Sequence, residues 1–258
     1  MVVYHHSKSV GKWQERDAIS TYNEIYRDEL YLHDGFFKLD DLTKTVFDCG
    51  ANIGLFSLWA AQRCPKAKIF AFEPIPHTFD MLKRNVARHG FDDRHQLYHV
   101  GLAEIPLNGK PHDREVNFRF YPEFSAISTC LWEEQEQIHI LTAPTEDNDL
   151  QIFERFETVE CKIRCLSDII KEEGVSEIDY LKIDVEGNEL DVINGLYRDD
   201  WNKIQQVCAE VQSTNGKIEK FKKILKDSGF EVSLTNAKAE WLGHGIKMIY
   251  GRRPEYRK

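Results

Sequence analysis

The chain has 258 residues, of which 41% are hydrophobic, and it carries a formal net charge of −9 at pH 7. A chain of this length is expected to form one large domain, or one domain with an appendage. The acidic balance argues against a nucleic-acid-binding protein, which usually presents a basic surface, and no apolar stretch approaches the ~20 residues that span a bilayer.

Six cysteines are scattered along the sequence. Cys161 and Cys165 lie four residues apart, but neither a second pair nor a nearby histidine completes a zinc-binding pattern. Most of the cysteines fall within apolar strand or helix patterns, so we expect buried free thiols in a reducing compartment. Residues 1–12 are polar and contain no signal-peptide core. These features predict a soluble cytoplasmic protein with no membrane partner.

Residues 1–40 are expected to form an N-terminal helical extension, and residues 41–258 the main domain. Apolar side chains recur at three- and four-residue steps from Ile19 to Leu30, which predicts a helix over residues 13–32. This segment is rich in aromatic residues. It either packs on the domain as an ordinary helix or caps the mouth of a binding site with aromatic side chains, and the sequence leaves both interpretations open.

A glycine-rich turn follows the first predicted strand, residues 45–49. The seven residues 48–54 read D-C-G-A-N-I-G and interrupt an apolar run before a helix predicted over residues 54–63. Glycine is needed where the backbone takes unusual dihedral angles or lets a ligand come close. The new helix also offers unpaired N–H groups at its start. The cofactor-binding residues expected in this turn are Asp48, Gly50, Asn52 and Gly54.

The second predicted strand, residues 68–73, ends in Glu73 and is followed by Pro74. A carboxylate there is placed to accept hydrogen bonds from ribose hydroxyls at the carboxyl ends of parallel strands. The dinucleotide pattern G-x-G-x-x-G is absent, because Asn52 stands where that pattern requires glycine. These features fit S-adenosylmethionine, which has a ribose and a cationic sulfonium but no phosphate. A βαβ turn without a ligand is the structural alternative, and an NAD(P) site is the weakest one.

The alternation continues with a helix over residues 76–89 and a strand over residues 96–100. Pro76 at the helix start and Gly90 after its end match the known asymmetry of helix termini. The residues expected in the cofactor site after this strand are His99, placed near the adenine, and Gly101.

Residues 101–158 are predicted to be an insertion, because so long an irregular section within an alternating pattern is usually functional or disordered. It contains a strand predicted over residues 115–121 and a helix predicted over residues 131–141. Residues 117–142 combine several aromatic side chains with serine and threonine hydroxyls. We expect this segment to form a lid that walls the acceptor site. The alternative is an extra hairpin that packs on the sheet.

After the insertion, strands and helices alternate again. The predicted strands are residues 159–164, 178–184, 204–211, 230–235 and 245–251, and the predicted helices are residues 167–173, 188–196 and 216–227. Alternating strands and helices imply a mostly parallel sheet with helices on both faces. The last two strands are consecutive, which implies an antiparallel edge.

The sequence K-I-D-V-E-G-N-E at residues 182–189 identifies a family. Together with residues 48–54, the F-E-P triplet at residues 72–74 and residues 82–85, it resembles FkbM-type S-adenosylmethionine-dependent methyltransferases. The resemblance extends over residues 15–251. It implies a Rossmann-like class I methyltransferase fold of the α/β class, with a mostly parallel seven-stranded sheet.

A finer resemblance links residues 24–31, 120–129, 189–192 and 200–204 to the FkbM-type O-methyltransferase domains built into polyketide and peptide assembly lines. One departure from those domains concerns the end of the fifth strand. This chain has Gln212 where such domains often carry histidine. If that histidine acts as a base in the relatives, this chain must use another group.

Charged residues at the end of the 178–184 strand are the strongest candidates for catalysis. Strand alternation predicts that Lys182, Asp184 and Glu186 share one side while Val185 points away. Charges in an apolar strand are costly unless they are paired. Either Asp184 contacts the methyl donor or accepts a proton, with Glu186 as a positioning group, or Lys182 forms a structural ion pair with one carboxylate. The expected catalytic residues are Asp184, Glu186, Lys182 and Glu210.

A metal site is a lesser alternative. Asp184, Glu186, Glu210 and His244 offer oxygen and nitrogen atoms, of which Mg²⁺ prefers oxygen, but their spacing does not require a metal and none is expected. His139 and His244 were considered as residues that face the acceptor, and an inert role is preferred for both.

The resemblance implies an S-adenosylmethionine-dependent O-methyltransferase that releases S-adenosylhomocysteine. The expected acceptor is a hydroxyl of a polyketide- or peptide-type small molecule, either free or bound to an acyl or peptidyl carrier protein. N- or C-methylation of a related acceptor is one alternative, and a non-catalytic domain that binds S-adenosylmethionine as a regulator is another. A homodimer is compatible with the sequence.

Overall fold

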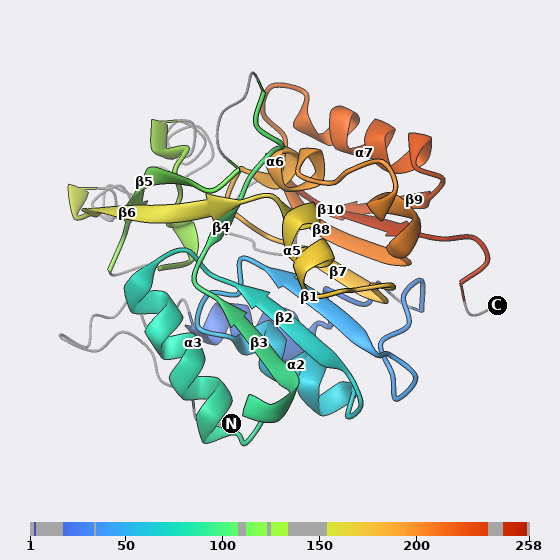
Figure 1. The fold of residues 1–258 in the computed structure, drawn as a ribbon, viewed down its shortest axis with the longest axis horizontal. Helices are drawn as coiled ribbons and strands as arrows, with labels where there is room; N and C mark the ends of the chain where they lie inside the picture. The colour runs from blue at the N-terminus through green and yellow to red at the C-terminus, as the bar shows by residue number, and fades with distance from the viewer. Residues whose placement is uncertain are drawn as a thin grey trace.

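The structure is a computed structural model, shown as a ribbon in Figure 1, and it describes residues 3, 18–33, 35–107, 112–122, 125–133, 154–236 and 245–256. A seven-stranded sheet forms its centre. In sheet order the strands are β3 (His95–Tyr98), β2 (Lys68–Phe72), β1 (Thr45–Cys49), β7 (Tyr180–Ile183), β8 (Gln206–Gln212), β10 (Ile246–Arg252) and β9 (Glu231–Asn236).

The first five strands of this order run parallel, and β10 is antiparallel to both of its neighbours. The predicted mostly parallel seven-stranded sheet with an antiparallel edge is therefore confirmed. The chain order reverses between β1 and β7, because β2 and β3 extend the sheet on one side and β8 extends it on the other. Ligands of open α/β sheets bind at the carboxyl ends of the strands at such a point.

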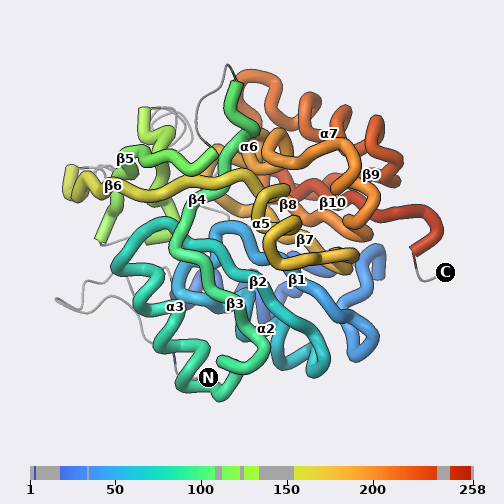
Figure 2. Tube along the Cα trace, in the orientation of Figure 1, coloured from blue at the N-terminus to red at the C-terminus, as the bar shows by residue number. Residues whose placement is uncertain are grey.

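Helices cover both faces of the sheet (Figures 1 and 2). One face packs against α5 (Leu166–Glu172), α6 (Glu189–Asn194) and α7 (Lys217–Asp227). The opposite face packs against α2 (Leu55–Arg63) and α3 (Pro76–Arg88). The parallel strands are apolar on both sides because both sides are buried. Three short 3₁₀-helices are also described: η2 (Asp92–Arg94), η3 (Ser125–Ile127) and η5 (Asp200–Lys203).

A second, three-stranded sheet lies beside the main one and consists of β4 (Gly101–Leu102), β6 (Glu157–Arg164) and β5 (Arg114–Phe120). β6 runs parallel to β4 and antiparallel to β5. The sequence pattern had placed the 159–164 strand in the main alternation, and this was wrong. The pattern shows that a strand forms, but it does not show that its partners are residues 101–102 and 114–120.

The N-terminal segment covers α2. Residues 18–22 are helical and continue into a π-helix, η1 (Asn23–Arg27), so the helix predicted to reach residue 32 ends earlier. The hydroxyl of Tyr26 donates to the Leu55 carbonyl at 3.5 Å. Part of the predicted helix, residues 13–17, lies outside the described residues. The described part packs on the domain, where its apolar side chains join the core around α2.

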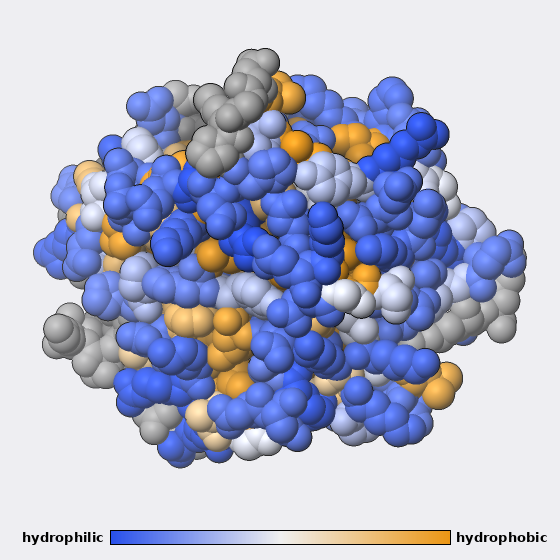
Figure 3. Space-filling view, in the orientation of Figure 1, coloured by the Kyte–Doolittle hydropathy of each residue, from blue (hydrophilic) through white to orange (hydrophobic). Residues whose placement is uncertain are grey.

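Several smaller expectations concern termini, thiols and the surface. Pro76 begins α3, and Gly90 follows its end with a positive φ of 70°, as predicted. All six cysteines are free thiols and five of them are buried. No helix among the described residues is long and apolar enough to cross a membrane. The face of the molecule in Figure 3 is mainly hydrophilic, with its apolar side chains in small separate patches.

Candidate functional site

A cavity lies at the carboxyl ends of β1, β2 and β7, beside the second sheet. Residues predicted for the cofactor site or for catalysis that line it are Gly50, Asn52, Glu73, Pro74, Gly101, Asp184 and Glu186. Residues of the second sheet and of the segment after it complete the lining and include Glu104, Arg114, Val116, Phe118, Ser125 and Ser128. The predicted residues that do not line it are Asp48, Gly54, His99, Lys182 and Glu210.

The floor of the cavity is the turn at Gly50, which has a positive φ of 77°. A Cβ atom at this position would lie 1.8 Å from the carbonyl oxygen of Asp184, so no other residue fits without moving the backbone. The Asp184 amide donates to the Cys49 carbonyl at 3.1 Å. Gly50 is therefore required by the close approach of β1 to the end of β7. Gly54 has a similar role against α3, because its Cβ would lie 2.7 Å from Leu82 Cδ1.

Below the turn, Asp48 and Lys182 form a buried ion pair, with 3.2 Å between Asp48 Oδ1 and Lys182 Nζ. Ser57 Oγ donates to Asp48 Oδ2 at 2.6 Å. Lys182 Nζ donates to the Gly50 carbonyl at 2.7 Å and so fixes the turn from beneath. Burial alone would lower the pKa of Lys182, but the charges of Asp48 and Asp184 raise it above its usual value. The ion pair with Asp48 agrees with the structural role that was the alternative to a catalytic role for Lys182.

Glu73 joins the turn to the end of β2. Its Oε2 accepts from the Asn52 amide at 3.0 Å, and its Oε1 accepts from the Ile75 amide at 2.9 Å. Burial raises the pKa of this carboxyl to about 7, although the two backbone donors lower it. Each carboxylate oxygen has a second lone pair, so both oxygens retain the capacity to accept a ligand hydroxyl in the cavity.

Asp184 follows β7 and lines the cavity with a quarter of its side chain exposed. Its Oδ2 accepts from the Tyr31 hydroxyl at 3.0 Å and lies 3.4 Å from Lys182 Nζ. Glu186 has a positive φ of 54°, so the chain turns here. The expected strand alternation was wrong, because β7 ends at Ile183 before the turn. Val185 therefore lines the cavity together with its two acidic neighbours and does not point away from it.

Glu210 lies near the carboxyl end of β8, half-buried. Burial, together with the negative charges of Asp184 and Glu186, raises the pKa of Glu210 well above its usual value.

Sequence analysis did not name Tyr31 as a site residue. The only signal was the aromatic richness of its segment, since 153 positions separate it from Asp184.

His99 stacks on Phe79 with 4.7 Å between ring centroids, and its side chain is exposed outside the cavity lining. Partial burial lowers its pKa. Gly101 lines the cavity, and a Cβ there would lie 3.1 Å from Ile163 Cγ2. His139 and His244 lie outside the described residues, so the structure places neither of them.

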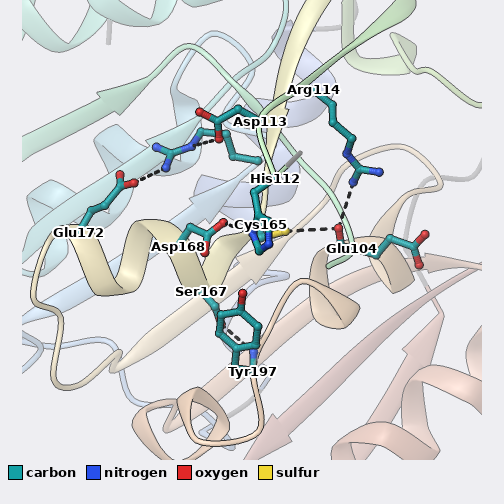
Figure 4. A network of polar contacts seen from close by, with 10 residues as sticks. Glu104, His112, Asp113, Arg114, Cys165, Ser167, Asp168, Glu172 and Tyr197 are labelled. Atoms are coloured by element: carbon teal, nitrogen blue, oxygen red, sulfur yellow. Dashed lines mark hydrogen bonds and ion pairs between the residues drawn. The ribbon is translucent and has the colours of Figure 1, made fainter. Parts of the chain in front are cut away.

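A polar network joins Glu104 and Arg114, which line the cavity, to the start of α5 (Figure 4). The Glu104 carbonyl accepts from Arg114 Nη2 at 3.0 Å and from Cys165 Sγ at 3.3 Å. His112 and Asp168 form a 2.7 Å hydrogen bond, and their side-chain atoms lie within 4.8 Å of Cys165 Sγ. The fold thus places His112 near Cys165, although no histidine lies near Cys165 in the sequence. Burial raises the pKa of Cys165 to about 11, so the thiol keeps its proton and the network supports the wall.

The predicted lid is partly described. Phe118, Ser125 and Ser128 line the cavity, whereas Phe120 and Tyr121 are buried in small apolar cores. The described part of this segment is attached to the floor by neutral hydrogen bonds: Ser125 Oγ donates to Asn52 Oδ1 at 3.2 Å, and Thr129 Oγ1 donates to the Glu186 carbonyl at 2.8 Å. Phe124 and most of the predicted helix over residues 131–141 lie outside the described residues.

The sequence model described as "Methyltransferase FkbM domain" matches residues 48–232. The chain is 31% identical over 256 residues to methyltransferase sdnD of Sordaria araneosa, covering 93% of this chain and 91% of that protein. It is 32% identical over 227 residues to the 31-O-demethyl-FK506 methyltransferase FkbM of Streptomyces tacrolimicus, covering 84% and 83% of the two chains. The AMB antimetabolite synthetase AmbE of Pseudomonas aeruginosa is 33% identical over 235 residues, but only 10% of that synthetase is covered.

Among solved structures, methyltransferase FkbM from Methylobacillus flagellatus superposes with a TM-score of 0.55 at 14% identity. The match covers 89% of this chain and 47% of that one, and at this identity it shows a shared fold. The family match includes the glycine turn, Glu73 and the K-I-D-V-E-G-N-E block, which together form the floor of the cavity. The chain is a methyltransferase that belongs to the FkbM family.

Proposed function

We propose that this protein transfers a methyl group from S-adenosylmethionine to a hydroxyl of a polyketide- or peptide-type natural product. The observation that carries the proposal is the single cavity that gathers Gly50, Glu73 and Asp184 where the order of strands reverses. Glu73 offers a partner for the ribose of such a cofactor, and Asp184 offers one for its sulfonium.

The donor set fits S-adenosylmethionine better than a dinucleotide. Glu73 presents acceptor oxygens for ribose hydroxyls, and Asp184 presents a negative charge for the sulfonium. Among the described residues that line the cavity, Arg114 is the only one with a cationic side chain, and it already donates to the Glu104 carbonyl. The glycine pattern that brings helix N–H groups close to a pyrophosphate is also absent, because Asn52 replaces one of its glycines.

S-adenosylmethionine supplies an activated methyl group, and the protein has to align the acceptor oxygen with it and remove a proton. Asp184 is the residue proposed to accept that proton or to hold it by a hydrogen bond. Positioning provides a large part of the rate of such a displacement, and a general base adds roughly 10²–10⁴-fold. The second sheet and the segment containing Ser125 and Ser128 line the side of the cavity that we assign to the acceptor.

The names of the relatives support oxygen as the acceptor atom. One relative is described as a 31-O-demethyl-FK506 methyltransferase, and another, NoeI of Sinorhizobium fredii, as a 2-O-methyltransferase. The match within a synthetase supports an acceptor presented by a carrier protein. N- or C-methylation remains the second candidate, and analysis of the methylated product separates these reactions.

Calorimetric titration with S-adenosylhomocysteine, with NAD⁺ as the control, tests the cofactor assignment first. We expect micromolar binding of the first ligand and no binding of the second. Binding of neither would contradict the proposal. A panel of hydroxylated acceptors, free and bound to carrier proteins, then tests the reaction, and absence of turnover with all of them would favour a regulatory domain that only binds the cofactor.

A further inference from the structure

Tyr31 is a buried residue of the N-terminal segment that reaches the candidate site. Its side chain is 3% exposed, and its hydroxyl donates to Asp184 Oδ2 at 3.0 Å. The match to the FkbM domain model begins at residue 48, so Tyr31 lies outside the residues that this model matches. Burial, and secondly the charge of Asp184, raise the pKa of Tyr31 well above its usual value, so the hydroxyl remains a donor.

A hydroxyl donor and an ammonium group face the same oxygen of Asp184. Lys182 Nζ lies 3.4 Å from Oδ2, on which Tyr31 also acts. Lys182 is itself fixed by Asp48 and by the Gly50 carbonyl. With Oδ2 engaged by protein groups, Oδ1 is the oxygen left for the cavity that Asp184 lines. The contacts therefore fix the direction in which this carboxylate faces a ligand.

The backbone on which Tyr31 sits is anchored to the sheet. The hydroxyl of Tyr180, on β7, donates to the Tyr31 carbonyl. The hydroxyl of Tyr250, on β10, donates to the Leu30 carbonyl at 2.8 Å. The ring of Tyr31 packs edge-on against Phe56 of α2, with 5.1 Å between centroids. Two strands and one helix thus position a hydroxyl that serves Asp184.

The surroundings of Asp184 otherwise oppose its charge. Glu210 on β8 interacts with Asp184 and with Glu186, and Glu24 on η1 adds negative charge on the same side. Like charges that lie close together repel one another. Lys182 on β7 and the hydrogen bond from Tyr31 hold the Asp184 carboxylate in place. Removal of the Tyr31 hydroxyl loses one of these two contacts.

We infer that Tyr31 is a positioning residue that holds the Asp184 carboxylate turned towards the methyl donor, so that the site binds cationic S-adenosylmethionine in preference to neutral S-adenosylhomocysteine. The inference rests on the proposed function, because it assigns the discrimination between donor and product to that same cavity. Such discrimination favours release of the product after each transfer.

Tyr31→Phe tests the inference with binding measurements alone, which require no acceptor. We expect the ratio of the two dissociation constants, S-adenosylhomocysteine over S-adenosylmethionine, to fall about tenfold, the size of a hydrogen bond to a charged group. S-adenosylhomocysteine binding should change little.

Tyr250→Phe is the matched control, because it removes a buried hydroxyl that anchors the same segment without touching Asp184. It should lower thermal stability and leave the ratio of dissociation constants unchanged. Asp184→Asn, which keeps the shape of the side chain, should reproduce the loss of discrimination even if Tyr31→Phe folds poorly. Parallel weakening of both ligands in Tyr31→Phe, or an unchanged ratio in Asp184→Asn, would overturn the inference. Failure of the unmodified protein to bind either ligand would instead overturn the proposed function.

Discussion

The floor and the wall of the cavity are held together by different forces. The floor, formed by the ends of β1 and β7, contains a buried ion pair between Asp48 and Lys182 and a backbone approach that only glycine permits. The wall, formed by the second sheet and by residues 125–131, contains small apolar cores, neutral hydrogen bonds to the floor, and the network of charged side chains around Arg114 and Arg164. A floor built in this way tolerates few substitutions, whereas the wall can change with the acceptor.

Gly50→Ala should have the largest effect. The new Cβ would meet the Asp184 carbonyl at 1.8 Å on a backbone with positive φ, so β1 and β7 would have to separate. We expect loss of cooperative folding, measured by thermal denaturation. Gly90→Ala is the control, since its φ of 70° is similar but no atom lies within 4 Å of the added Cβ. It should cost only about 1–2 kcal/mol, and equal losses in the two variants would refute the close-approach argument.

Lys182→Met should have the next largest effect on stability. It removes the cation that faces Asp48 and leaves a buried carboxylate without its partner, which typically costs 3–5 kcal/mol of unfolding free energy. Chemical denaturation measures the difference. Lys68→Met is the matched control, because Lys68 pairs with Glu173 at 3.2 Å on the surface, where the loss is about 1 kcal/mol or less. Similar losses in both variants would mean that Lys182 is not a structural part of the floor.

The floor was predictable from sequence, whereas for the wall only the segment that lines the cavity was predictable and its strand pairing was not. The glycine turn, Glu73 and the K-I-D-V-E-G-N-E block are local patterns whose geometry follows from strand ends in a parallel sheet. The wall depends on pairing between residues 101–102 and β6, about 60 positions away in sequence, and strand patterns do not specify partners. Strand alternation also failed at Val185, because a turn with positive φ at Glu186 had replaced the strand.

Glu73→Gln tests the cofactor role at the floor. A neutral amide accepts hydrogen bonds from ribose hydroxyls less strongly than a carboxylate, so S-adenosylhomocysteine affinity should fall about 10- to 100-fold. Because burial raises the pKa of Glu73 to about 7, its charged form is lost as pH falls through that value. Binding should therefore weaken below about pH 7 in the unmodified protein and become pH-independent over this range in the variant. Retention of the pH dependence in Glu73→Gln would assign it to another group.

Thr129→Val should have the smallest effect on stability and on cofactor affinity. It tests the comparison with a residue of the wall. Its hydroxyl donates to the Glu186 carbonyl at 2.8 Å and accepts from the Leu131 amide at 3.0 Å. Both bonds are neutral, so their loss should cost about 1–2 kcal/mol of unfolding free energy, and affinity for S-adenosylhomocysteine should change less than about threefold because Thr129 does not line the cavity. Thr129→Ser restores the hydroxyl and should restore stability. A cofactor affinity that falls as far as in Glu73→Gln would show that the wall sets the shape of the floor, and the two regions would then form one unit.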